Sequence, residues 1–239
     1  MRIVKNIFRS VILLVMSVML LAGFTVAGKG YELYRDAVEA TSLEDKVAEI
    51  RNKEGYTKLE ELPQVYLNAV VSVEDHRFYR HFGLDPIAIG RAVVHDIQAG
   101  RYVEGGSTIT QQLAKNLYFT QEKELTRKAA EVFVALELEK NYTKDEILEL
   151  YVNSIYFGDG YYTAGDASRG YFGKGPEQMN EYESTLLAGI PNAPGRYAPT
   201  KSQELAEKRQ MQVLRRMKAC GYFSEEEAET VASQMVALQ

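Results

Sequence analysis

The chain has 239 residues, 46% hydrophobic and 26% charged, which is the composition of a folded protein with room for one sizeable domain and an appendage. The formal net charge of −5 argues against general nucleic-acid binding, and a single cysteine, Cys220, excludes an internal disulfide. The histidines at 76, 81 and 95 lack the spacing of a zinc site, so no metal site is predicted.

The N-terminus predicts a membrane segment. Residues 10–28 carry no charge and are long enough to cross a bilayer as a helix. Arg2, Lys5 and Arg9 precede this run, which favours a cytoplasmic N-terminus. A cleaved signal peptide is the alternative, because "TVAGK" at the end of the run offers small residues. The length of the run favours an uncleaved, single-pass anchor in the cell (inner) membrane, with the rest of the chain on the outer face.

The remainder of the chain predicts a mainly α fold. We expect a cytoplasmic tail over residues 1–9, the transmembrane anchor over 10–28, a juxtamembrane linker or helix over 29–61, and a folded domain over 62–239. Apolar residues recur at helical spacing and strand signals are weak. The predicted helices cover about residues 62–75, 85–100, 108–118, 123–141, 143–153 and 180–190, with a pair after residue 200 and a glycine- and tyrosine-rich loop over 157–175.

The helix near residue 108 has two distinct stripes. Gly105 and Gly106 precede Ser107, which is a suitable N-cap. Ile109, Leu113 and Leu117 form an apolar stripe, whereas Ser107, Gln111 and Lys115 form a stripe with a hydroxyl, an amide and a cation. Such a stripe could bind sugar hydroxyls and a phosphate. A capped polar helix without a ligand explains the same pattern.

Glu74 is the first candidate for proton transfer. It ends an apolar helix, so nearby Val70, Val71 and Phe78 should desolvate it, raise its pKa and make it a proton acceptor. Its neighbour Asp75 points elsewhere, and we expect it to bind a backbone amide. The alternative for Glu74 is a helix-ending acid paired with an arginine of the following "HRFYR".

Glu131 is the second candidate, and it lies among cations. Arg127 and Lys128 are at helical spacing from it, which keeps it ionised, although a plain surface salt bridge explains the same spacing. Lys115 and Lys123 could converge with these two cations, and such a cluster binds phosphate well. The combination of carboxylates, polar ligands, cations and a membrane anchor suggests sugar chemistry on a lipid-linked phosphate.

Four segments, in this order, resemble the motifs of the peptidoglycan glycosyltransferases, the lipid II polymerases that occur alone or within bifunctional penicillin-binding proteins. The segments are "EDHRFYRHFG", "GGSTITQQLAKN", "RKAAE" and "KDEILELYVNSIYFG". The later "AGIPNAPGRYAPT" and the arginines of "KRQMQVLRRM" also match, so the resemblance covers about residues 62–238. Four ordered motifs are far more specific than any one of them.

The resemblance implies a lysozyme-like, two-lobed α fold and an inverting transfer between the growing glycan strand and lipid II. By motif position Glu74 matches the base that deprotonates the acceptor hydroxyl, and Glu131 matches a second glutamate near the phosphates. The residues implied in binding sugar and pyrophosphate are Ser107, Gln111, Gln112, Lys115, Lys123, Arg127 and Asn153. The implied partners are lipid II, the growing strand, the bilayer, and proteins of cell-wall synthesis or division. A divalent cation at the pyrophosphate is left open.

The segment over residues 81–100 is expected to contact the membrane surface. Ile87, Ile89 and Val93 have few partners evident in sequence, and in the family this region dips into the bilayer surface. Ordinary core packing is the alternative.

The chain departs from the family pattern in a few places. Val152 replaces the usual leucine beside Asn153, and Asp166 and Ser168 lie where alanines are common. No SxxK, SxN or KTG set appears in the sequence, which predicts a monofunctional enzyme. A lytic enzyme of lysozyme type would also use a glutamate in an α cleft, but it would need neither the cations nor the anchor. An inactive membrane-anchored scaffold is a third hypothesis, against which the two glutamates argue.

Overall fold

A computed structural model describes residues 2–100, 105–119 and 125–237 of the chain. Apart from two isolated β-bridges, the regular structure in these ranges is helical, which confirms the mainly α class. The α-helices are α1 (Arg2–Ala40), α2 (Leu43–Arg51), α3 (Gln64–Glu74), α4 (Pro86–Ala99), α5 (Ile109–Tyr118), α6 (Leu125–Asn141), α7 (Lys144–Val152), α8 (Ala164–Phe172), α9 (Glu181–Gly189), α10 (Pro194–Tyr197), α11 (Gln203–Ala219) and α12 (Glu225–Ala237). Short 3₁₀ turns cover Leu59–Glu61, Phe78–Arg80, Pro176–Gln178 and Ile190–Asn192.

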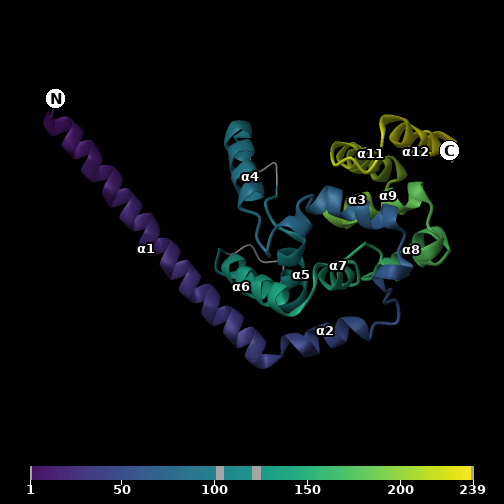
Figure 1. The fold of residues 1–239 in the computed structure, drawn as a ribbon, viewed down its shortest axis with the longest axis horizontal. Helices are drawn as coiled ribbons and strands as arrows, with labels where there is room; N and C mark the ends of the chain where they lie inside the picture. The colour runs from purple at the N-terminus through teal and green to yellow at the C-terminus, as the bar shows by residue number, and fades with distance from the viewer. Residues whose placement is uncertain (1, 101–104, 120–124, 238–239) are drawn as a thin grey trace.

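Helix α1 is longer than the predicted anchor. It continues without a break through residue 28 to Ala40, and its span Lys5–Ala40 is long and apolar enough to cross a membrane. The first half of α1 projects away from the rest of the molecule (Figure 1), and its most apolar stretch is wholly exposed. The chain then turns at Thr41, and Ser42 caps α2 by accepting a hydrogen bond from the amide of Asp45. Of the two alternatives for residues 29–61, a linker or a helix, the structure shows a segment that is largely helical.

The body of the molecule is built around one hydrophobic core. Helix α3 packs against α9 and α11, and α5 packs against α6 and α7 (Figure 1). Tyr66, Ala69 and Val70 of α3 are buried there, as the apolar spacing of this segment predicts. Val152 is also buried, so this departure from the family pattern lies in the core.

Helix α5 begins one residue later than predicted. Thr108, rather than Ser107, is the N-cap: its hydroxyl accepts from the Gln111 amide, and the Gln111 side chain accepts from the Thr108 amide. Ile109, Leu113 and Leu117 are buried as predicted. Because Gln111 completes this capping box and is buried, it leaves the predicted polar stripe.

Helix α6 lies between α1 and α5, and both of its sides are covered. The sequence spacing predicts an apolar face made of Leu125, Ala129, Val132, Phe133 and Leu136. Part of this face contacts α1: Phe133 stacks edge-on against Tyr31, with ring centroids 5.3 Å apart. The buried face is instead formed by Ala130, Glu131, Val134, Ala135 and Leu138. The prediction that Leu125 and Leu136 belong to a packed face was wrong, since both are exposed.

Two further segments differ in how well the sequence predicted them. Helix α4 agrees with its prediction: Asp85 caps it, Pro86 is its first residue, and Gly100 ends it in the left-handed conformation.

The stretch predicted as a loop over residues 157–175 instead contains α8, and the Thr163 side chain caps this helix by accepting a hydrogen bond from the Asp166 amide. Thr163 is a typical helix N-cap residue, but the many glycines around it led to the prediction of a loop. Asp166 and Ser168 both lie on this helix.

Candidate active site

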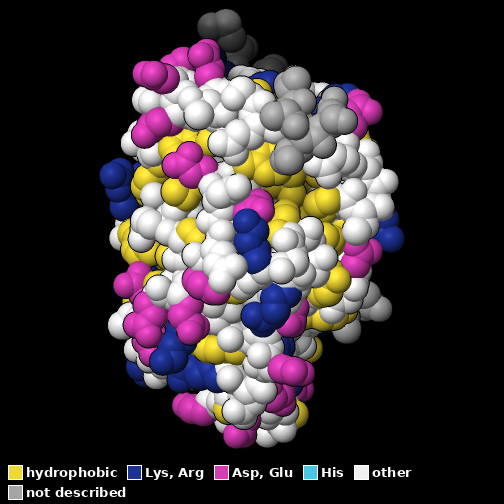
Figure 2. Space-filling view, turned by 90° about the vertical axis from the view of Figure 1, so that its right-hand side faces the viewer, with side chains coloured by type: hydrophobic (Ala, Val, Ile, Leu, Met, Phe, Trp, Pro, Cys, Tyr) yellow, Lys and Arg dark blue, Asp and Glu magenta, His cyan; other side chains and the backbone are white. Residues whose placement is uncertain are grey.

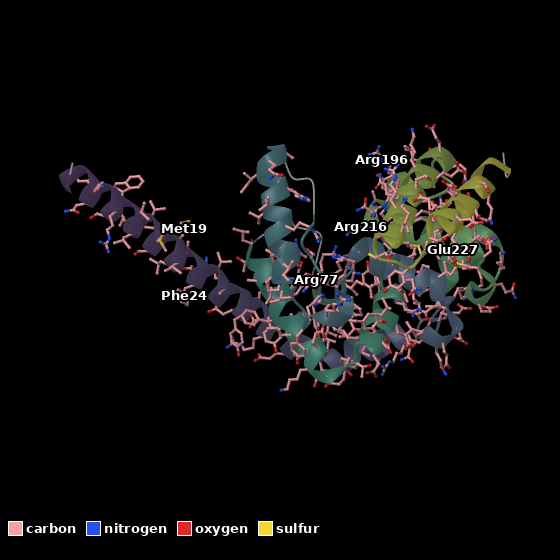
Figure 3. All side chains as sticks on the ribbon, turned by 45° about the horizontal axis from the view of Figure 1, so that its top comes forward. Met19, Phe24, Arg77, Arg196, Arg216 and Glu227 are labelled. Atoms are coloured by element: carbon pink, nitrogen blue, oxygen red, sulfur yellow. The ribbon has the colours of Figure 1, made fainter. Side chains whose placement is uncertain are left out.

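A cleft of about 680 Å³ lies where α3 ends, and four of the predicted site residues line it: Glu74, Ser107, Gln112 and Lys115. Helix α4 forms one wall and α11 forms the other, while the end of α3, residues 105–108 before α5, and Gln112 and Lys115 of α5 form the floor. In Figure 3, Arg216 extends from α11 on the side of α4. The polar and charged residues lining the cleft are Glu74, Asp75, His76, Arg91, Ser107, Thr108, Gln112, Lys115, Asn192, Arg209, Gln212, Arg215 and Arg216.

Glu74 is the last residue of α3 and is half-buried on the floor of the cleft. Gln112 Nε2 donates a hydrogen bond of 2.8 Å to its Oε2. The hydroxyl of buried Tyr151 donates to Gln112 Oε1 at 3.2 Å, which fixes the orientation of the amide so that its NH₂ group faces the carboxylate. The alternative pairing of Glu74 with Arg77 or Arg80 is not formed among the described residues, and Arg77 Nε instead binds Asp85 Oδ2 at 2.9 Å.

The electrostatics of the cleft suit Glu74 to proton transfer. Burial raises its pKa above the ordinary value, while the hydrogen bond from Gln112 and the charges of Arg209 and Lys115 oppose that rise. A carboxylate held this way is a stronger base than an exposed one and keeps its charge through nearby cations. The predicted rise in the pKa of Glu74 therefore follows from its desolvated position.

Asp75 has a different task from its neighbour. Its Oδ2 accepts a hydrogen bond of 3.1 Å from the Ile109 amide in the first turn of α5, as expected for a side chain pointing to a backbone amide. His81 Nε2 lies 2.9 Å from the same oxygen. These contacts join the end of α3 to the start of α5 and thereby hold Glu74 over Gln112.

Three of the four predicted cations, Lys115, Arg127 and Lys128, lie close together beside the cleft. Lys128 Nζ donates to Ser107 Oγ and to Glu131 Oε2, each at 2.7 Å, and Arg127 pairs with the other oxygen of Glu131. Burial, followed by the charges of Arg127 and Lys115, lowers the pKa of Lys128 to about 8. Burial and the charge of Arg127 also lower the pKa of Lys115. Repulsion between neighbouring cations contributes to both lowered pKa values, and a bound anion would relieve this repulsion. The cluster is therefore suited to binding an anion.

Several predicted residues are not in the cleft. Glu131 is buried behind it and contacts the cations, and Gln111 is used in the helix cap. Asn153 is fully buried: its amide bonds both the N–H and the C=O of Thr57 and the C=O of Glu149. Asn153 thus connects the chain before α3 to the end of α7 through hydrogen bonds. Lys123 lies outside the described residues.

The sequence assigned no role to the arginines that form the α11 wall. Arg209 and Arg216 lie there with Gln212, and Arg91 of α4 lies opposite. Residues 209, 212 and 216 recur at i, i+3 and i+7, a spacing that places them on one helix face and could have indicated the wall. On the face shown in Figure 2, by contrast, acidic and basic side chains are interspersed.

These features define a class: a mainly α domain on an apolar helix, with a desolvated carboxylate between two groups of cations. A family model described as Transglycosylase matches residues 39–218, and the chain belongs to that family. The match begins before the predicted domain start at residue 62. It confirms the family resemblance read from the four motifs.

Curated relatives agree with this assignment. The chain is 45% identical over 177 residues to penicillin-binding protein 1A of Aquifex aeolicus, covering 74% of this chain and 24% of that protein. It is 38% identical over 246 residues to penicillin-binding protein 1F of Bacillus subtilis, covering 98% of this chain and 34% of that protein. A crystal structure of penicillin-binding protein 1A from Haemophilus influenzae is 23% identical, with a TM-score of 0.45, over 74% of this chain and 17% of that one.

The chain therefore spans about a quarter to a third of the length of the curated relatives it matches. The expectation of a monofunctional enzyme stays a prediction.

Proposed function

We propose that the chain polymerises lipid II into glycan strands by inverting glycosyl transfer, in bacterial cell-wall synthesis. The observation that carries this proposal is the placement of Glu74: a desolvated carboxylate, oriented by Gln112, between two groups of cations. The family to which the chain belongs supports glycosyl transfer as the class of reaction.

Glu74 takes the proton from the 4-hydroxyl of the acceptor sugar. The oxygen forms a bond to the anomeric carbon of the donor from the face opposite the pyrophosphate. The bond from that carbon to the pyrophosphate oxygen breaks, which gives a β-1,4 linkage and releases polyprenyl pyrophosphate. Because the leaving pyrophosphate carries its own negative charge, nearby cations can stabilise it without a general acid.

The two groups of cations match the two lipid-linked phosphates of this reaction. Lys115, Arg127 and Lys128 would hold the pyrophosphate of the donor, with Ser107 fixed by Lys128. The arginines of α11 and Arg91 would hold that of the acceptor on the other side of Glu74. A hydrolase of lysozyme type needs one sugar chain and water, so it has no use for a second cationic wall. A divalent cation would add to the charge at the donor phosphates, and chelation during the assay tests for it.

The membrane is the second proposed partner. Ile87, Ile89 and Val93 of α4 are 59%, 41% and 51% exposed, so they are not packed in the core. Helix α4 and the first half of α1 project from the body toward the same side in Figures 1 and 3. With α1 in the bilayer and its N-terminus in the cytoplasm, α4 would meet the membrane surface where the polyprenol tails lie.

The direct test of this assignment replaces Glu74 with Gln in the full chain and measures lipid II polymerisation in detergent. Glu74→Gln keeps the shape of the side chain and removes the proton acceptor. We expect the rate to fall by about two orders of magnitude or more, the usual contribution of a general base. An unchanged melting temperature would show that the fold is kept, and near-normal polymerisation would remove Glu74 from the mechanism.

A further inference from the structure

The contact between α1 and α6 is unusually close at one residue. Gly30 is the only buried residue of α1 among those whose burial is described. A Cβ atom at this position would overlap the methyl group of Ala129 and lie 3.0 Å from the amide nitrogen of Ala130. Helix backbones approach this closely only where one of them lacks a side chain. Gly30 therefore sets the distance between the two helices.

The point of contact lies directly behind the cation cluster. Ala129 and Ala130 separate Arg127 and Lys128 from Glu131 along α6, and each of the two cations pairs with Glu131. On its other side α6 packs against α5, from which Lys115 reaches the cleft. A shift of α6 relative to α5 would move Arg127 and Lys128 away from Lys115 and from Ser107.

Other contacts make this junction rigid. Tyr31 and Tyr34 of α1 both pack against Phe133 of α6, with ring centroids 5.3 and 5.8 Å from it. The hydroxyl of Tyr118, at the end of α5, donates to the carbonyl of Thr41, where α1 ends. The second half of α1 is therefore fixed to both helices that carry the cations, rather than joined to the domain by a flexible tether.

We propose that Gly30 is a positioning residue: the close approach of α1 at Gly30 sets where α6 holds Arg127 and Lys128, and so couples the membrane helix to the phosphate site. The identity of the anion rests on the proposed function, whereas the coupling itself rests on the packing. Packed interfaces of this kind respond to added volume by shifting as units.

The test compares Gly30→Ala with Gly28→Ala in the full chain in detergent. Gly28 lies on the same helix, and a Cβ there meets nothing within 4 Å, so both variants gain the same methyl group and only one gains a clash. Two properties are measured: the affinity for geranyl pyrophosphate by calorimetry, and the pH dependence of Lys128 acylation by mass spectrometry.

We expect Gly30→Ala to bind geranyl pyrophosphate about tenfold more weakly or worse, since a displacement near 1 Å can cost more than that. The titration of Lys128 should also move away from its pKa of about 8, whereas Gly28→Ala should match the wild type in both measurements. The double variant Gly30→Ala with Ala129→Gly transfers the methyl group from one helix to the other. It should regain part of the affinity, and it remains informative if Gly30→Ala alone does not fold.

The proposal is overturned if Gly30→Ala matches Gly28→Ala in both measurements, because α1 would then yield to the clash without moving α6. It is also overturned if the double variant is no better than Gly30→Ala. Suppose that the wild type fails to polymerise lipid II, yet Gly30→Ala alone shifts the Lys128 titration. The proposed function would then be wrong and the coupling would stand.

Discussion

At the scale of single residues, the hydrogen bond from Gln112 to Glu74 has a measurable consequence. This bond lowers the pKa of Glu74, whereas burial raises it. The base must be ionised, so activity should rise with pH through the pKa of Glu74. Replacing Gln112 with Leu removes the opposing contribution, raises that pKa further and moves the acidic limb of the pH–rate profile to higher pH. A profile of Gln112→Leu with the acidic limb at or below that of the wild type would contradict this account.

Arg127 gives a second prediction at this scale. It pairs with buried Glu131 and, in our proposal, binds the donor pyrophosphate. Replacing Arg127 with Lys keeps the charge but loses the planar fork that can bind phosphate bidentately. We expect weaker binding of geranyl pyrophosphate and slower polymerisation, with Arg127→Ala more severely affected. Equal affinity of Arg127→Ala and wild type for that ligand would remove the residue from the phosphate site.

Asn153 illustrates what the sequence could and could not predict about single residues. A glutamate after an apolar helix is recognisable in sequence, because desolvation follows from its immediate neighbours. The bonds of Asn153 to Thr57, and the contact of Tyr151 with Gln112, join residues far apart in the chain. No local pattern contains them, and the family resemblance alone implied that Asn153 binds the ligand.

The structural position of Asn153 predicts a stability effect. Asn153→Ala leaves the N–H and C=O of Thr57 without their partner in a buried setting, at a cost of about 1–3 kcal/mol for each group left unsatisfied. We expect a lower free energy of unfolding in denaturant titrations, while the KM for lipid II stays near that of the wild type. A raised KM with unchanged stability would instead favour the ligand-binding role.

At the scale of elements, helix starts were predictable where a capping residue is followed by an unbroken helical pattern. Asp85 before α4 and Thr143 before α7 are such cases. Helix α8 was missed because its glycines and tyrosines suggested a loop. The buried face of α6 was misplaced because a helix covered by neighbours on two sides has no single apolar stripe, and its covering partner, α1, was expected to be only an anchor.

At the scale of the whole molecule, α1 has two parts that differ in their contacts. Of the residues before Gly30 whose burial is described, all but Val26 are exposed, whereas the part from Gly30 onward contacts α6. A truncation that starts at Lys29 keeps the contact and should stay folded. It should polymerise lipid II more slowly than the full chain in vesicles, where the anchor holds enzyme and substrate in one bilayer, and comparably in detergent. Equal rates in both settings would show that the anchor has no part in substrate capture.

The central claim is that Glu74 directs a sugar hydroxyl, rather than water, to the anomeric carbon. The most direct measurement incubates the purified full chain with lipid II and resolves the products by size and by end group. We predict β-1,4-linked strands of many units together with released polyprenyl pyrophosphate, and loss of both in Glu74→Gln. Short products that end in a free reducing sugar, with no strand longer than the substrate, would contradict the account and indicate a hydrolase.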